Sequence, residues 1–224
     1  MTDPSLTLGI IIFTRFPEPG LTKTRLIPLL GPEGACRLHR ELTEKIVAQV
    51  QQVIIGYPLG MEIHFSGGSR EQMAGWLGRD LEYVIQERGH LGARMRLAFR
   101  KGFRQGWKRV VLIGSDLPDL TPAIIRESFE RLTSHDLVLG PALDGGYYLI
   151  GLKANRPQLF GSSILWGTKE VLKNTLITAD QLGLRTALLD RLRDVDRPED
   201  LNEDIRLNYP KTLKTEYPTR NNQE

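Results

Sequence analysis

The fold is decided by VVLIGSDLPDL at residues 110–120, where a short apolar run leads directly into a loop that carries Asp116 and Asp119. The glycine after the run and the proline inside the loop indicate that a buried strand ends here. Asp116 is therefore expected at the carboxyl edge of a sheet, where α/β enzymes bind ligands and where a divalent cation and a phosphate can meet a carboxylate. The alternative is that Asp116 only shapes a turn. Asp119 is expected to cap a helix that begins near Thr121-Pro122.

The composition of the chain is typical of one globular domain. The chain has 224 residues, of which 40% are hydrophobic and 25% charged, and no linker-like stretch divides it. We expect one catalytic domain over residues 1–209 and a polar, flexible tail over 210–224. The net charge of +3 is too small to suggest a nucleic-acid partner. A single cysteine, Cys36, excludes an intrachain disulfide and a cysteine-based metal cage, and is expected to pack inside a helix.

Neither a membrane segment nor a leader is indicated by the sequence. No apolar run reaches membrane-spanning length, and the first residues do not resemble a signal peptide. These patterns predict a cytoplasmic protein without a membrane partner, and they leave the oligomeric state open.

Strand and helix patterns alternate along the chain, which predicts an α/β fold. Strands are expected at 8–13, 61–65, 81–85, 110–113, 137–139, 147–150 and 186–189, and helices at 32–53, 69–77, 91–103, 122–132, 168–182 and 198–207. A long loop is expected between the first strand and residue 31. The connection before 147–150 is too short for a crossover helix, so this strand is expected to be antiparallel in a mixed sheet.

The loop after the first strand has the composition of a phosphate-binding loop. It supplies a turn glycine, two hydroxyls and two cations, which are Gly20, Thr22, Lys23, Thr24 and Arg25. Backbone N–H groups and hydroxyls can donate to phosphate oxygens, while the lysine acts as a point charge and the arginine as a bidentate donor. The glycine spacing of a Walker A motif is missing. The alternative interpretation is a solvated basic loop.

Two further loops carry candidate ligand-binding residues. In the segment 86–95, between a strand end and a helix start, Gly92 permits close approach to a nucleotide and Arg94 projects from the first helical turn, whereas His90 is interpreted as an ordinary loop histidine. In GPALDGGYY at 140–148, the pair Gly145-Gly146 permits a ligand to lie against the backbone while Asp144 binds a hydroxyl or an amine. A tight hairpin turn is the competing interpretation of Asp-Gly.

Candidates for a pocket wall and for further metal ligands follow later in the chain. Trp166 is a candidate pocket wall, although tryptophan is more commonly a core residue. In DVDRPEDL at 194–201, Asp194 and Asp196 precede an acidic helix start that capping and the helix dipole explain. With Asp116, these two aspartates can complete an oxygen-rich site for Mg²⁺ or Mn²⁺, with Asp196 as the expected second ligand.

Six segments resemble, in this order, the radical-SAM/selenodomain-associated transferase family: PEPGLTKTRL, LGARM, GSDLPDL, GPALDGGYYLIGL, WGTKEVL and DVDRPEDL. This family is a bacterial branch of the nucleotide-diphospho-sugar transferases with the glycosyltransferase-A fold. The resemblance covers residues 8 to about 206 and implies a single-domain, Rossmann-like three-layer α/β/α sandwich with a mostly parallel mixed sheet. It also implies Lys23 and Arg25 on phosphates, Asp116 on a metal, and Asp144 to Gly146 near the donor or acceptor.

The leading functional hypothesis is a Mg²⁺- or Mn²⁺-dependent glycosyltransferase that uses a nucleotide-sugar donor and a small-molecule acceptor. Asp116, Lys23 and Asp144 are the expected catalytic residues. One alternative is nucleotidyl transfer, in which a phosphorylated acceptor attacks a nucleoside triphosphate and pyrophosphate leaves. Another is a non-enzymatic nucleotide-binding module, which has no evident need for the aspartates.

Overall fold

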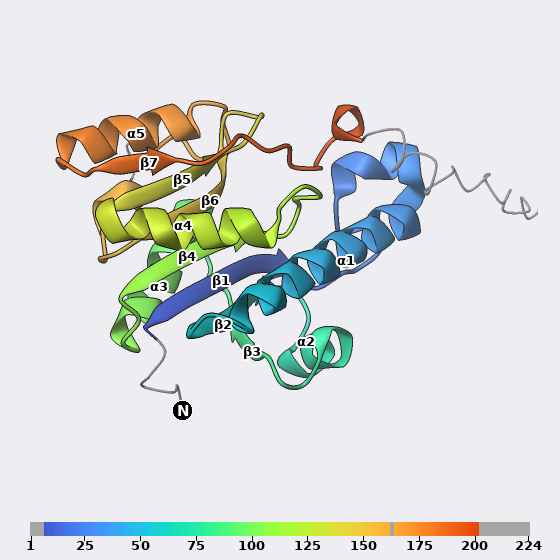
Figure 1. The fold of residues 1–224 in the computed structure, drawn as a ribbon. Helices are drawn as coiled ribbons and strands as arrows, with labels where there is room; N and C mark the ends of the chain where they lie inside the picture. Colours follow the sequence, from blue (N-terminus) through green and yellow to red (C-terminus); the bar gives the residue numbers. More distant parts are fainter. Residues whose placement is uncertain (1–6, 162–163, 202–224) are drawn as a thin grey trace, which may run out of the picture.

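The structure, a computed structural model that describes residues 7–161 and 164–201, contains one seven-stranded sheet with helices on both faces (Figure 1). The strand order is β3-β2-β1-β4-β6-β5-β7. The strands are β1 (Leu8–Arg15), β2 (Leu59–Ser66), β3 (Glu82–Ile85), β4 (Arg109–Gly114), β5 (Leu137–Pro141), β6 (Tyr147–Leu152) and β7 (Thr186–Leu188). The predicted domain boundary at 209 and tail at 210–224 lie outside the described residues.

Strand β6 is the one antiparallel strand of this sheet. It pairs antiparallel with β4 and with β5, whereas β1 with β2, β1 with β4, β2 with β3 and β5 with β7 are parallel. Residues 142–146 alone join β5 to β6, and so few residues can only turn the chain back on itself. The predicted mixed, mostly parallel sheet is confirmed.

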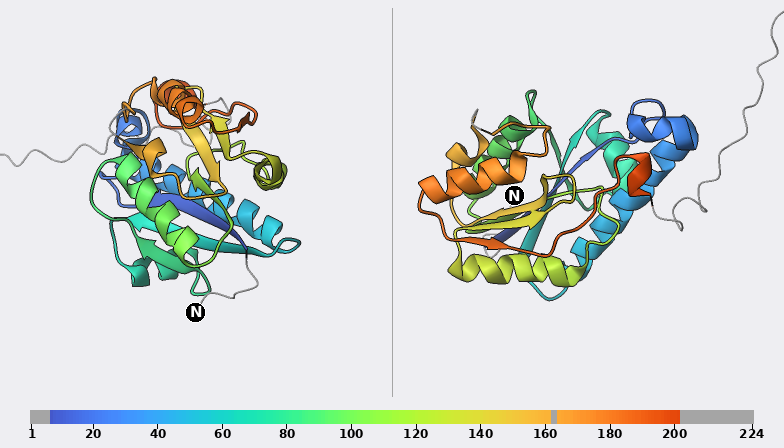
Figure 2. Two further views of the ribbon diagram at one scale, coloured as in Figure 1. Left: turned by 90° about the vertical axis from the view of Figure 1, so that its left-hand side faces the viewer. Right: turned by 90° about the horizontal axis from the view of Figure 1, so that it is seen from above.

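Helices cover both faces of the sheet, giving the three predicted layers. The helices are α1 (Ile27–Ile54), α2 (Arg70–Leu77), α3 (Leu91–Arg104), α4 (Pro122–Ser134) and α5 (Val171–Gln181). On one face, Ile46 of α1 and Phe129 of α4 pack with Ile10 and Ile12 of β1. On the other, Phe99 of α3 packs with Ile11. The view from above in Figure 2 places α1 and α4 on one side of the sheet and α3 and α5 on the other.

Helix α1 begins earlier than predicted. The chain is already helical from Thr24, first as a 3₁₀ turn over Thr24–Leu26 and then as α1, so the long loop expected up to residue 31 ends at Lys23. Gly31, with φ 72° and ψ 167°, kinks the helix immediately before Pro32. The predicted start at Pro32 therefore marks the kink, because proline is tolerated in a helix only within the first turn.

Three other helix predictions need correction, although α4 begins at Pro122 as predicted. Thr121, and not Asp119, caps α4, since its Oγ1 accepts the N–H of Ile124 at 3.4 Å. Helix α5 begins at Val171, three residues later than predicted, because Thr168 accepts the Glu170 N–H within a turn. The segment Pro198–Asp200 is a single 3₁₀ turn. The rest of the helix predicted at 198–207 lies beyond the described residues, except Leu201, which is extended.

A third apolar cluster fixes the region beyond the carboxyl edge of the sheet. Leu26, at the end of the 3₁₀ turn, and Leu30, at the start of α1, pack with Leu38, Val195 and Leu201. All five are almost fully buried. The cluster therefore ties the first loop to the segment that follows β7. Cys36 is buried in α1, as predicted, and no helix of the described residues is long and apolar enough to cross a membrane.

Glu62 of β2 is a buried carboxylate with two partners. Its Oε2 lies 2.8 Å from His64 Nε2, and its Oε1 accepts a hydrogen bond from Lys101 Nζ of α3. Burial alone raises the pKa of a carboxyl group, but here the hydrogen bonds from His64 and Lys101 outweigh it and lower the pKa of Glu62 to about 2.

We expect Glu62 to stabilise the fold at neutral pH and to lose this contribution in acid. Because its pKa in the folded state lies below the unfolded value of 4.5, the contribution is present above that pH and disappears as the pH falls toward 2. Urea unfolding at pH 7 and near pH 2.5 tests this. The free energy of unfolding of the wild type should fall by about 2–3 kcal/mol more than that of Glu62→Gln.

Glu82→Gln is the matched control, because it removes an exposed carboxylate from the neighbouring strand β3. This variant should follow the wild type at both pH values. If the wild type and Glu62→Gln lost the same stability in acid, the buried ion pair would not be the cause.

Candidate functional site

A cavity of 1240 Å³ opens at the carboxyl ends of β1 and β4. From β1 the sheet extends to β2 on one side and to β4 on the other, so the cavity lies where the strand order reverses, the usual ligand position in an open α/β sheet. Its walls come from the first loop, the β5–β6 turn, residues 166–171 and residues 193–200. Every residue predicted for the site lines this cavity except Gly20, Gly92 and Gly145.

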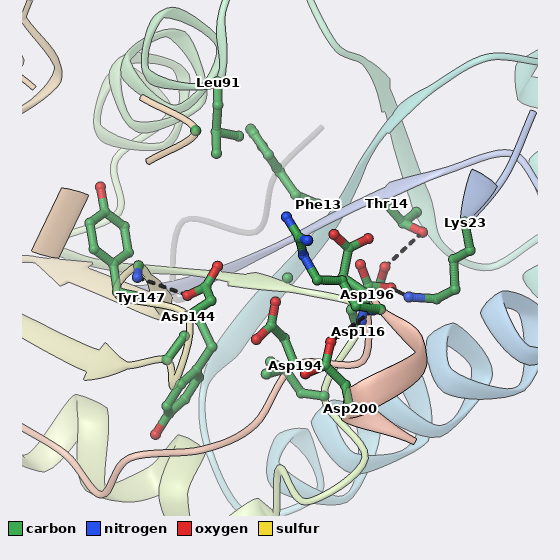
Figure 3. A pocket seen from close by; sticks show the side chains of 18 of the residues that line it. Phe13, Thr14, Lys23, Leu91, Asp116, Asp144, Tyr147, Asp194, Asp196 and Asp200 are labelled. Atoms are coloured by element: carbon green, nitrogen blue, oxygen red, sulfur yellow. Dashed lines mark hydrogen bonds and ion pairs between the residues drawn. The ribbon is translucent and has the colours of Figure 1, made fainter. Parts of the chain in front are cut away.

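Asp116 and Lys23 form a partly buried ion pair at the floor of the cavity (Figure 3). Lys23 Nζ lies 2.8 Å from Asp116 Oδ1 and also donates to the carbonyl oxygen of Val195. The Lys23 side chain is 3% exposed, whereas that of Asp116 is 41% exposed. Since Asp116 Oδ1 is shielded from solvent, the exposure falls on the other side of the carboxylate, which faces the cavity.

The backbone of Lys23 occupies an uncommon conformation. With φ 46° and ψ 48° it is the one non-glycine residue at positive φ in the described chain, a conformation that costs an ordinary side chain roughly 1–2 kcal/mol. Such outliers persist where surrounding contacts hold them. Here the Nζ contacts hold the residue, and Thr22, fully buried, accepts the Glu18 N–H at 3.0 Å to shape the loop. Thr24 is exposed.

His39 of α1 lies close to the same oxygen of Asp116 as Lys23 does. Its Nδ1 lies 3.6 Å from Asp116 Oδ1, and its Nε2 lies 3.0 Å from the Arg15 carbonyl, to which it can donate. Burial alone raises the pKa of Asp116, but the charge of Lys23 and the proximity of His39 outweigh it and hold the pKa well below its usual range. Asp116 is therefore ionised at neutral pH. The hydroxyls of Thr14 and Ser115, 3.1 Å apart, link the ends of β1 and β4 beside it.

The segment after β7 brings two more aspartates to the cavity. The Val195 N–H donates to the Asp116 carbonyl at 2.9 Å, and the Val195 side chain is buried in the apolar cluster with Leu26. Because side chains alternate along an extended segment, Asp194 and Asp196 both face the cavity. Asp196 pairs with Arg25, and both side chains are substantially exposed.

The carboxylates around the cavity raise the pKa of Asp194. Burial is the largest cause, and the negative charges of Asp144, Asp200 and Asp116 add to it, so that the pKa of Asp194 rises to about 6. In Figure 3 these aspartates point into the same space from three separate segments. Crowded carboxylates of this kind form the donor set whose mutual repulsion a divalent cation relieves.

The carboxylates fit a Mg²⁺ or Mn²⁺ ion that is bound jointly by the protein and the substrate, rather than one that protein side chains alone surround. In residues 7–161 and 164–201, no three His, Cys, Asp or Glu side chains lie close enough together to enclose a metal. Magnesium is commonly held by one or two carboxylates, with substrate phosphates and water as its other ligands. Asp116 and Asp194 can supply the two carboxylates, whereas Asp196, the second ligand expected from the sequence, is paired with Arg25.

The β5–β6 turn is built so that Asp144 stands at the cavity wall. Asp144 Oδ1 accepts the Gly146 N–H at 2.8 Å, which fixes the carboxylate. Gly145 has φ 93°, and a Cβ there would lie 2.2 Å from the Lys169 carbonyl oxygen. Gly145 therefore serves the turn and its contact with residues 166–171, while Asp144 and Gly146 line the cavity. The hairpin and the ligand-facing interpretations of this segment are compatible.

The start of α3 differs in detail from the sequence interpretation. His90 caps the helix, since its Nδ1 accepts the Ala93 N–H at 3.3 Å, and its ring stacks on Trp166. A Cβ at Gly92 would lie 2.2 Å from the Trp166 ring, so Gly92 makes room for the indole. Trp166 lines the cavity as predicted. Arg94 also lines it and donates to Gln86 Oε1 at 2.8 Å.

His39 is not among the residues predicted for the site, and Asp194 is predicted as a possible metal ligand after Asp196. His39 lies on the apolar stripe of a predicted helix, one residue after Leu38, and a histidine in such a stripe is a detectable signal. Alternation around the apolar Val195 indicates that Asp194 and Asp196 share a face. No sequence pattern shows which of the two forms an ion pair with Arg25.

Comparisons with known proteins show the family and the fold of the chain. The model of a family described as "Uncharacterized protein conserved in bacteria (DUF2064)" matches residues 44–168, more than half of the chain. A solved structure from Desulfovibrio desulfuricans G20, provisionally assigned as a nucleotide-diphospho-sugar transferase, is 33% identical with a TM-score of 0.79. The match covers 91% of this chain and 89% of that one. A search of curated proteins gave no match.

More distant structures share the fold. The inositol-1-phosphate CTP transferase of T. maritima is 14% identical, with a TM-score of 0.54, and the match covers 89% of this chain and 94% of that one. Glucosyl-3-phosphoglycerate synthase of Mycobacterium tuberculosis, solved with Mn²⁺, UDP and glucosyl-3-phosphoglycerate, is 14% identical, with a TM-score of 0.55 and coverage of 87% and 74%. These likenesses and the 33% identical match confirm the predicted fold class of nucleotide-diphospho-sugar transferases.

Proposed function

We propose that this chain, which belongs to the DUF2064 family, is a divalent-metal-dependent glycosyltransferase that uses a nucleotide-sugar donor and a small-molecule acceptor. The observation that carries the proposal is the position of Asp116: ionised, at the carboxyl end of β4, with one oxygen held by Lys23 and the other side facing the cavity. The provisional assignment of the 33% identical protein as a nucleotide-diphospho-sugar transferase supports it. The narrower relationship to radical-SAM/selenodomain-associated transferases is part of the proposal and rests on the six segments.

The residues have separate roles in the proposed reaction. Asp116 and Asp194 would hold Mg²⁺ or Mn²⁺, which when bound would supply positive charge to stabilise a departing nucleoside diphosphate. Lys23 orients Asp116 through its buried contact. Arg25, which is exposed at the mouth of the cavity, binds phosphate oxygens with charge-assisted hydrogen bonds.

The other wall of the cavity suits the sugar or the acceptor. Asp144 is fixed by the Gly146 N–H through one oxygen, and its remaining acceptor capacity can orient a hydroxyl group. Trp166 offers an apolar surface on the same side. These groups would bind and position the sugar or the acceptor. The charge of the departing nucleoside diphosphate would be stabilised at the opposite wall.

Nucleotidyl transfer is the second candidate. The fold likeness to the CTP transferase favours it, as does the presence of several carboxylates at one cavity, because in-line attack on a phosphate requires charge neutralisation on both the attacking and the leaving oxygens.

The identity of the released product separates the two reactions. We expect a nucleotide-sugar donor labelled in the sugar, incubated with Mn²⁺ and a cell extract, to yield nucleoside diphosphate without pyrophosphate while the label passes to an acceptor. Separation of the nucleotides and a pyrophosphate assay provide the measurement, and Asp116→Asn provides the inactive control. Stoichiometric pyrophosphate from a nucleoside triphosphate, with the nucleotide joined to the acceptor, would replace the proposal by the second candidate.

A further inference from the structure

A second cavity lies between α3 and strand β3, on the face of the sheet away from α1. Its volume is 420 Å³. Four cations line it, which are Arg94, Arg100, Lys101 and Arg104, and Glu87 is the one carboxylate in its lining. Helix α3 carries no acidic residue at all. We call this cavity the α3 groove.

Most hydrogen-bond donors in the α3 groove have no acceptor in the described part of the chain. Arg100 and Arg104 are exposed and form no ion pair there. Arg94 Nε and Gln105 Nε2 are shielded from solvent without a hydrogen-bond partner, although shielded polar atoms are normally paired. The lining of the groove therefore offers several cationic donors and one carboxylate, which is the chemistry of a site for an anion.

The groove is anchored from below. Lys101 Nζ donates to the buried carboxylate of Glu62 and, at 3.2 Å, to Gln105 Oε1. This second bond occupies the amide oxygen of Gln105 and leaves its NH₂ group as a donor. Because Glu62 neutralises Lys101, the unbalanced positive charge of the groove belongs chiefly to the arginines.

The α3 groove is separated from the main cavity by one hydrogen-bonded pair. Arg94 and Gln86 line both cavities and are joined by the 2.8 Å bond from Arg94 to Gln86 Oε1. Gln86 is itself fixed, since its Nε2 donates to the His64 carbonyl at 2.8 Å. A ligand in the groove is thus a neighbour of the nucleotide site without entering it.

We propose that the α3 groove is a second binding site, for a small molecule that carries a phosphate group. Arginine guanidinium groups match phosphate oxygens in geometry and charge, and the apolar side chains of Val84, Ile85 and Leu97 in the lining can pack against carbon atoms of such a molecule. The size of the cavity suits a small ligand rather than a polymer. The proposal stands independently of the reaction assigned to the main cavity.

Calorimetric titration with inorganic pyrophosphate, without divalent metal, tests this site. Arg100→Gln combined with Arg104→Gln should weaken binding at least tenfold. The matched control combines Arg96→Gln with Arg126→Gln, which removes the same charge from exposed arginines outside both cavities, and it should change affinity less than threefold. Glu87→Gln, which removes the carboxylate, should strengthen binding severalfold.

Two outcomes would overturn the proposal. Equal weakening in both double variants would mean that pyrophosphate responds only to the overall charge. The Arg25→Ala variant distinguishes the two cavities, because Arg25 lines the main cavity and not the groove. Groove binding should survive that change. If Arg25→Ala abolished pyrophosphate binding while the groove variant retained it, the anion would be in the main cavity.

Discussion

Asp116→Asn should lower transferase activity at least about a thousandfold while the chain still folds, with a lower free energy of unfolding because the buried Lys23 loses its charged partner. A thousandfold loss corresponds to about 4 kcal/mol of transition-state stabilisation, the order expected when a site loses a metal-binding carboxylate. Asparagine keeps the size of the side chain but is neutral, so it cannot balance the charge of Lys23 and is a weaker ligand for a divalent cation than a carboxylate. Activity in the product assay, Mn²⁺ affinity by calorimetry and the circular dichroism spectrum together provide the measurement.

Asp119→Asn is the control for this variant. Asp119 lies in the same loop, is exposed, and neither lines the cavity nor caps α4, so its substitution should leave activity and Mn²⁺ affinity within about twofold of the wild type. An Asp116→Asn protein with full activity in saturating Mn²⁺ would remove Asp116 from the catalytic site.

Lys23→Ala and Arg25→Ala should affect different properties, although the two residues lie close together in one loop. Lys23→Ala should mainly lower stability, whereas Arg25→Ala should mainly weaken nucleotide binding. Lys23 is buried between Asp116 and the Val195 carbonyl, but Asp116 is itself partly exposed, so the loss is that of a charge-assisted hydrogen bond, typically about 1.5–3 kcal/mol. We expect Lys23→Ala to lower the free energy of unfolding by that amount. Arg25→Ala breaks only an exposed pair with Asp196, so stability should change by less than about 1 kcal/mol.

Nucleotide binding should then separate the two roles. The exposed guanidinium of Arg25 can reach phosphate oxygens, and a charge-assisted hydrogen bond contributes about 1.5–3 kcal/mol. Arg25→Ala should therefore weaken nucleotide affinity roughly tenfold or more at nearly unchanged stability. Urea unfolding and calorimetric titration measure the two effects. If the Lys23→Ala protein were as stable as the Arg25→Ala protein, the ion pair of Lys23 would not hold the loop. Unchanged nucleotide affinity in both variants would favour the interpretation of a solvated basic loop.

The order of strands and helices could be predicted from sequence because each element carries its own local signal. The apolar runs at β1 and β4 and the helical periodicity of α1 depend on neighbouring residues alone. The antiparallel direction of β6 followed from the short connection at 142–146. Helix caps were less predictable, since Asp119 and Thr121 are both good caps by composition and the backbone geometry selects between them.

The candidate site was predictable as a set of loops but not as a set of contacts. Sequence order could suggest that Lys23, Asp116 and the 194–196 segment belong to one site. Sequence order could not show that Lys23 contacts Asp116 rather than solvent, or that Arg25 forms an ion pair with Asp196. Such pairings depend on the relative positions of segments far apart in the chain, which local patterns do not encode.

The bond from Lys23 to the Val195 carbonyl spans 172 residues, and this separation has a consequence for synthesis on the ribosome. A nascent chain that ends before residue 195 contains Asp116 and Lys23 but lacks the segment that closes the apolar cluster around Leu26. Contacts of such long sequence separation form late, because the intervening loop must first be ordered. The proposed nucleotide site is therefore complete only after residue 195 has emerged, and in shorter nascent chains Lys23 lacks its contact with the Val195 carbonyl.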